Sequence, residues 1–174
     1  MIAKGLGAGY QPIGAMLCQD YIHDAIEHGS GFFQHGHTYL GHPIAAAAAN
    51  AVLDRLVVDG LVDDVAQKGE YLKSQLKAKL GQHPNIGNIR GRGLFIGIEF
   101  VASQDDKTPF DPAFNVAGNL KKNAFQSGLA CYPAQGTIDG RTGDHVLLAP
   151  PFIITNDEMD MLVDRLALAV GMTI

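Results

Sequence analysis

The chain has 174 residues, of which 47% are hydrophobic and 18% are charged, and its formal net charge is -5. This composition excludes wholesale disorder, and the acidic balance argues against nucleic acid or an anionic membrane as the main partner. Two Cys are too few for a disulfide framework. No apolar run reaches membrane-spanning length, and the N-terminus lacks the apolar core of a signal peptide. We therefore expect a cytoplasmic globular protein.

The first half of the chain is predicted to open with a glycine-rich loop around Lys4. Residues 14–18 read as a short buried strand, and residues 19–28 read as a helix with one apolar face. Pro43 is typical of a helix start, and that helix should end near residue 60. A second helix is predicted for residues 61–80. The lone strand has no sheet to join, so this half is structurally incomplete by itself.

The second half alternates strands and helices. Strands are predicted at residues 94–101, 129–133 and 145–149, and helices at residues 114–126 and after residue 155. Thr155, with Glu158 three residues later, is a capping-box signature for the last helix. The pattern predicts an α/β fold made of two parts, residues 1–84 and residues 85–174.

Lys4 stands in the segment AKGLGAGYQPIGA. Glycines beside a lysine could cradle phosphate through backbone N–H groups, but the order matches neither GxxxxGK[ST] nor GxGxxG. A flexible surface loop is the simplest alternative. A third use of such a lysine is a Schiff base with a carbonyl compound, because glycines let the backbone pass close to a flat cofactor.

This segment resembles the lysine motif of the class III pyridoxal-phosphate aminotransferases, the ω-aminotransferase group of fold type I. Three further stretches resemble motifs of that family in the same order, namely HGHTYLGHPIAAAAA, IRGRGLFIGIEF and CYPAQGTIDGRTGDHVLLAPPF. Together they span the whole chain, which is similar to the C-terminal portion of an enzyme more than twice its length. The resemblance thus implies the end of the large domain in residues 1–84 and a small α/β domain in residues 85–174.

The resemblance also implies functional residues. Lys4 matches the lysine that carries pyridoxal 5'-phosphate as a Schiff base, and Thr38 matches the residue that reaches the cofactor phosphate of the neighbouring subunit, which implies a homodimer. Arg141 is a candidate for binding the substrate carboxylate. The alternative for Arg141 is an exposed turn residue paired with Asp139 or Asp144.

Two other polar groups have structural explanations. The three histidines of HGHTYLGHP (His35, His37 and His42) have no neighbouring carboxylate or Cys, so a polar loop is favoured and no metal site is expected. Arg90 or Arg92 is expected to form a structural salt bridge rather than a substrate contact. The role of Glu99 is left open.

Membership of this family would imply transfer of an amino group from an amine or amino acid to a keto acid such as pyruvate. In the family, the carboxylate at the pyridine nitrogen, the phosphate-binding loop and the stacking aromatic all precede the lysine, so the chain alone is expected to be inactive or severely impaired. Its first half is also expected to expose apolar surface. The alternatives are a non-catalytic remnant, half of a split enzyme, and an aminomutase or decarboxylase.

Overall fold

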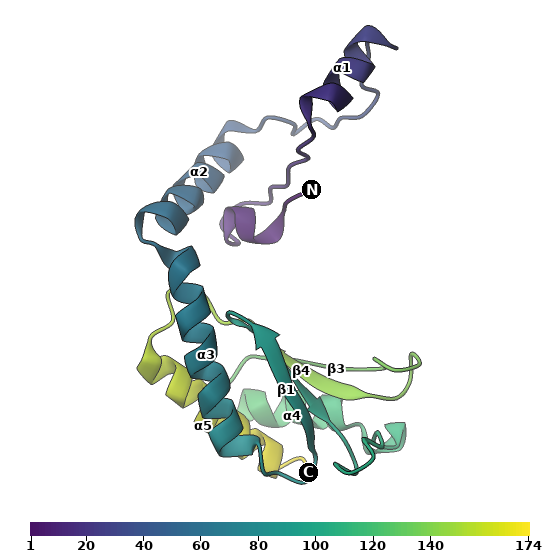
Figure 1. Cartoon of the computed structure of the whole chain (residues 1–174), viewed down its shortest axis with the longest axis vertical. Coiled ribbons are helices and arrows are strands. Elements are labelled where there is room, and N and C mark those ends of the chain that lie inside the picture. Colours follow the sequence, from purple (N-terminus) through teal and green to yellow (C-terminus); the bar gives the residue numbers. More distant parts are fainter. The chain divides into compact units, whose positions relative to one another are not determined.

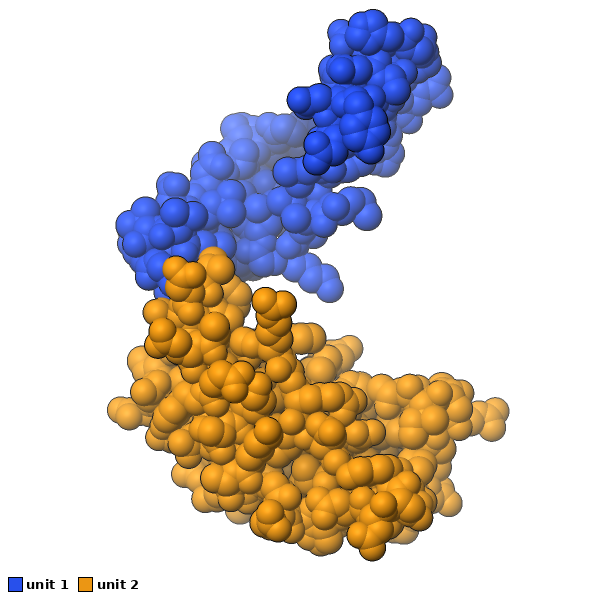
Figure 2. Space-filling view, in the orientation of Figure 1, with its two compact units in different colours: residues 1–61 blue, residues 62–174 orange.

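The computed structural model describes all 174 residues and divides into two compact units, shown in different colours in Figure 2. Unit 1 is Met1–Leu61 and unit 2 is Val62–Ile174. The predicted division after residue 84 stays a prediction. The helix Leu61–Leu80 (α3) lies between the predicted boundary and the observed one, and its apolar side packs in the core of unit 2.

Unit 1 has little core of its own. It contains a 3-10 helix and two α-helices, η1 (Lys4–Gly7), α1 (Asp20–His28) and α2 (Pro43–Val58). Only Gly7, Ala45 and Ala49 are buried. Most large apolar residues of this unit are exposed, among them Met16, Leu17, Tyr21, Phe32, Phe33, Leu40, Ile44, Val57 and Val58. The expected exposure of apolar surface in the first half is confirmed.

The predicted strand at residues 14–18 is wrong. Ala15 forms a single antiparallel bridge with Ile2, in which each backbone N–H donates to the other residue's carbonyl oxygen at 2.8 Å. A strand needs a ladder of such pairs along a neighbouring strand. Residues 14–18 have no other such partner in this chain, so the apolar run stays irregular and exposed. The three helices predicted in the same half are confirmed as α1, α2 and the helix Leu61–Leu80 (α3).

Unit 2 is a four-stranded antiparallel sheet with three helices (Figure 1). The strands lie in the order β1-β2-β4-β3. The elements are α3 (Leu61–Leu80), β1 (Ile86–Arg92), β2 (Phe95–Phe100), the 3-10 helix η2 (Pro112–Phe114), α4 (Val116–Gln126), β3 (Tyr132–Gln135), β4 (Asp144–Leu148) and α5 (Asn156–Gly171). The predicted α/β class is therefore correct.

The register of the two central strands builds one apolar face of the sheet. Ile96 lies opposite Leu148, and Ile98 lies opposite Val146. These four side chains are buried, because side chains alternate between the two faces of a strand. All three helices cover this face, and they contribute the core residues Leu72, Leu76, Leu80, Leu120, Ala124, Met159, Val163, Leu166 and Val170.

The differences from the predicted elements lie at glycines and turns. Strand β1 was missed, because Gly87 and Gly91 interrupt its apolar alternation. Helix α4 begins at Val116, after Asn115 adopts a left-handed conformation with φ of 48°. Strand β3 begins three residues later than predicted, at Tyr132, and Pro133 pairs with Val146 of β4. The predicted capping box of Thr155 and Glu158 is present at the start of α5.

Candidate functional site

Lys4 is the first residue of η1, in a tightly turned loop. Its φ of 51° and the φ of 45° at Ala8 place non-glycine residues in the left-handed region at both ends of this helix. The bridge between Ile2 and Ala15 closes the loop. The side chain of Lys4 is exposed, and its ammonium group makes no hydrogen bond or ion pair within the chain.

Helix α2 packs against η1, the short helix that begins at Lys4. The buried residues of these two elements are all small, namely Ala45 and Ala49 on α2 and Gly7 on η1. A Cβ added at Gly7 would lie 2.9 Å from Cγ2 of Ile13, so the loop also packs closely on itself. A larger residue at position 7 would therefore need the Ile13 side chain to move.

Thr38 lies in a turn before α2 and is exposed. Its neighbours His37 and Tyr39 line a groove of about 690 Å³, together with residues 11–14, residues 40–42, Ala45 and Ala46. His42 ends this turn as the N-cap of α2, and its Nδ1 accepts a hydrogen bond from the Ala45 N–H at 3.3 Å. Thr38 and Lys4 both belong to unit 1, and no hydrogen bond joins them.

Arg141 lies in the turn between β3 and β4 of unit 2 and is exposed. The Asp139 carboxylate accepts from the backbone N–H groups of Arg141 at 2.8 Å and Thr142 at 2.7 Å, and these bonds hold the pKa of Asp139 below its ordinary value. The guanidinium forms no ion pair with Asp139 or with Asp144. The structure therefore shows the exposed turn of the alternative, with a backbone bond to Asp139, but not an ion pair of the Arg141 side chain.

Asp144 is a structural residue that the sequence analysis considered only as a possible partner of Arg141. It is only 1% exposed, and its Oδ1 accepts a hydrogen bond from the Ala117 N–H at the start of α4, at 3.1 Å. Its Oδ2 has no partner. Burial raises the pKa of this carboxyl, while the bond from Ala117 and the nearby His145 act in the opposite direction. The signal for it was its place in CYPAQGTIDGRTGDHVLLAPPF, the last of the four motifs.

The structural salt bridge predicted in the motif IRGRGLFIGIEF is confirmed for Arg90. Its Nη1 lies 3.0 Å from Oε2 of Glu99 on the neighbouring strand. The two residues border a groove of about 320 Å³ on the sheet, beside His145 of β4. Glu99, whose role was open, therefore has a charge partner in the sheet.

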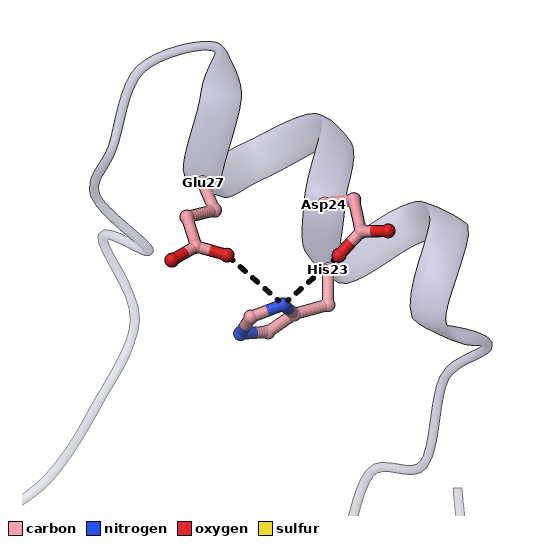
Figure 3. Close-up of side chains that lie close together, drawn as sticks. All are labelled: His23, Asp24 and Glu27. Atoms are coloured by element: carbon pink, nitrogen blue, oxygen red, sulfur yellow. Dashed lines mark ion pairs between the residues drawn. The ribbon is translucent and has the colours of Figure 1, made fainter.

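A cluster of three titratable side chains, His23, Asp24 and Glu27, lies on α1. Figure 3 shows the imidazole of His23 between two carboxylates, with Nδ1 3.7 Å from Oδ1 of Asp24 and 3.7 Å from Oε2 of Glu27. All three side chains are exposed. His23 and Glu27 are four residues apart, which is the spacing of an ion pair along one helix when the histidine is protonated. None of the three is among the residues predicted for the functional site.

Comparison with known proteins identifies the family that shares these motifs. The family model described as Aminotransferase class-III matches residues 1–170. The chain belongs to the class III aminotransferases. A Gibberella zeae protein named aminotransferase is 42% identical over 170 residues, which are 97% of this chain and 33% of that protein. A Schizosaccharomyces pombe protein named uncharacterized aminotransferase is 45% identical over 177 residues, which are 99% of this chain and 38% of that protein.

Solved transaminase structures share the fold of this chain. An amine transaminase from an uncultivated Pseudomonas species, in the PLP-bound (internal aldimine) form, matches with a TM-score of 0.85 at 36% identity, over 98% of this chain and 37% of that one. The chain thus spans about a third of the length of the class III aminotransferases that it matches. This share agrees with the predicted match to a C-terminal portion. None of the helices has the length and apolar character to cross a bilayer.

Proposed function

We propose that this chain supplies the part of an aminotransferase site that contains the catalytic lysine, and that Lys4 is this lysine and the residue that attaches the cofactor. The supporting observation is the free, exposed ammonium of Lys4 at the start of a glycine-rich loop, in a chain whose residues 1–170 match the class III family. The proposed reaction moves an amino group from an amine or amino acid to a keto acid such as pyruvate.

The residues of this chain fit part of a pyridoxal 5'-phosphate site. Lys4 Nζ is a primary amine that can attach to the cofactor's aldehyde, and the exposed Thr38 hydroxyl is a donor for the phosphate. When bound, this cofactor supplies the electron sink for the carbanion formed on the substrate. Thr38 would serve the site of a second copy, so the proposal includes a homodimer of the intact enzyme.

Lys4 would have two roles in this scheme. Its Nζ would hold the cofactor, and the same nitrogen would serve as the base for the proton on the amino-bearing carbon of the substrate. Arg141 would bind a substrate carboxylate, because its guanidinium is exposed and its charge has no partner in the chain. These roles are our proposal for the three residues.

The test uses the purified full chain mixed with pyridoxal 5'-phosphate and then reduced with borohydride. We expect an absorption band of the bound cofactor, and mass spectrometry should find the reduced adduct on Lys4. The Lys4→Ala variant should lose the band, while Lys68→Ala should keep it. Equal labelling of all lysines in the wild-type chain would contradict the proposal.

A second measurement tests the activity of the chain. We expect no turnover of an amine with pyruvate by the chain alone, because its residues supply only part of the site. Addition of a separately expressed N-terminal portion of a class III relative should restore turnover with the wild-type chain and not with Lys4→Ala. Turnover by the chain alone would contradict the expected inactivity, and turnover by the Lys4→Ala mixture would remove Lys4 from the mechanism.

A further inference from the structure

Both ends of the helix that carries Lys4 have backbone conformations that need support. Lys4 and Ala8 have positive φ values of 51° and 45°, which is an unfavourable region for residues with a Cβ atom. Such conformations persist only where the surrounding structure holds them in place. The bridge between Ile2 and Ala15 ties the two ends of the loop together, but it leaves the direction of η1 itself open.

The surface that fixes η1 is one side of α2. These two elements pack against each other within unit 1. Ala45 and Ala49 are the buried residues of α2, at 7% and 5% exposure. They are four residues apart and therefore lie on the same side of the helix. Ala47, between them in sequence, points away and is exposed. Because η1 packs on α2, we infer that it covers these two alanines and lies close to the α2 backbone there.

We propose that Ala45 and Ala49 are positioning residues for Lys4. Their single methyl groups let Gly7 and the rest of η1 lie close to α2, and this close contact sets the direction in which the Lys4 side chain leaves the loop. A larger side chain at either position would push η1 outward, because a packed contact has no space for added methylene groups. The proposal rests on the proposed role of Lys4, and it adds that α2 determines the orientation of that residue.

The test compares three single variants of the full chain. Ala49→Leu adds bulk on the buried side of α2, Ala47→Leu makes the same change on the exposed side, and Ala49→Ser keeps the buried side chain small. Far-UV circular dichroism checks that α2 forms in each. The Leu substitutions have similar effects on helix propensity, so a difference between them reports on the contact with η1.

The first measurement needs no cofactor. The N–H groups of Leu6, Ala8 and Tyr10 donate to carbonyls inside the loop at 3.2, 3.2 and 2.8 Å, so their hydrogen exchange reports on its geometry. We expect Ala49→Leu to speed their exchange about tenfold, and Ala47→Leu and Ala49→Ser to leave it near the wild-type rate. Equal exchange in the two Leu variants, or no protection of these amides in the wild-type chain, would overturn the proposal.

The second measurement is the share of borohydride-trapped pyridoxal 5'-phosphate found on Lys4. We expect this share to fall in Ala49→Leu and to stay at the wild-type level in Ala47→Leu and Ala49→Ser. Faster exchange in Ala49→Leu without a lower share on Lys4 would overturn the positioning role. If wild-type Lys4 is labelled no more than other lysines, the proposed function fails, and the exchange data still decide whether α2 holds the loop.

Discussion

Asp144 shows how one buried carboxylate can start a helix from another part of the chain. Asn115 stands at the N-cap position of α4 but makes no side-chain cap bond. Asp144 supplies the acceptor instead, from β4, through its bond with the Ala117 N–H. A negative charge at this end of a helix is also favourable to the helix dipole. The strand and the helix are thus joined by one side chain.

Removal of this acceptor should destabilise unit 2. We expect Asp144→Ala to lower the free energy of unfolding by about 1–3 kcal/mol, because the Ala117 N–H is then buried without a partner. Asp144→Asn keeps an acceptor oxygen and should cost less. Thermal unfolding followed by circular dichroism measures both variants. A larger loss for Asn than for Ala would contradict the role of Asp144 as a cap.

The same residue predicts a pH dependence. Burial raises the pKa of Asp144 in the folded protein above the ordinary value of 3.8, so the folded state holds its proton more tightly than the unfolded state. Stability due to this group therefore increases as pH falls through the folded pKa toward 3.8, and decreases as pH rises. The melting temperature of the wild-type chain should rise relative to that of Asp144→Asn over this range. A difference that does not change with pH would contradict the prediction.

Among the elements, α3 and the hairpin of β1 and β2 meet at two glycines. A Cβ at Gly69 of α3 would overlap the backbone of Gly93 in the turn. Ala is normally better than Gly inside a helix by about 1 kcal/mol. Here we expect the reverse, with Gly69→Ala lowering stability by about 1–3 kcal/mol, because neither backbone can move without loss of core packing.

A second glycine in a helix provides the control for this prediction. Gly171 is the last residue of α5, and a Cβ added there would meet no atom within 4 Å. Gly171→Ala should leave the melting temperature unchanged or raise it. Equal effects of the two substitutions in thermal unfolding would show that the contact between Gly69 and Gly93 is unimportant.

Elements with local signals were predictable, and those that depend on distant partners were not. Pro43 and the pair of Thr155 and Glu158 mark helix starts through their own backbone chemistry, and both helices begin where predicted. Strand β1 depends on pairing with β2, which its own residues do not reveal. Residues 14–18 have the apolar pattern of a strand but only one bridge partner, Ile2.

The candidate site followed from motif resemblance rather than from periodicity. Nothing in the hydrophobic pattern distinguishes Lys4 from a lysine in a surface loop, and its left-handed backbone could not be read from a single sequence. The contact of η1 with Ala45 and Ala49 was likewise hidden, because a run of alanines indicates only a good helix former. Close packing of that helix becomes visible only in three dimensions.

At the scale of the whole molecule, the two units differ in how much apolar surface they bury. The core residues all lie between Leu72 and Val170 in unit 2, whereas unit 1 buries two alanines and one glycine. Because burial of apolar surface is the main source of stability, unit 1 should open at a lower free energy than unit 2.

Limited proteolysis of the full chain tests this difference. The first cuts should fall between α1 and α2, in the exposed segment of residues 29–42. A resistant product that contains residues 62–174 should remain, as seen by mass spectrometry of the digest. Early cleavage inside the sheet, before residues 29–42 are cut, would contradict the prediction.

The proline in β3 limits how copies of this chain can associate. Strand β3 is one edge of the sheet, and Pro133 within it has no N–H to offer to an additional strand. Edge strands are otherwise templates for aggregation through backbone pairing, and a proline there prevents the sheet from growing in that direction. Self-association through β3 is therefore not expected. The exposed apolar side chains of unit 1 are the surface that we expect it to use, so detergent or mutation of Phe32 and Phe33 should reduce it while changes in β3 should not.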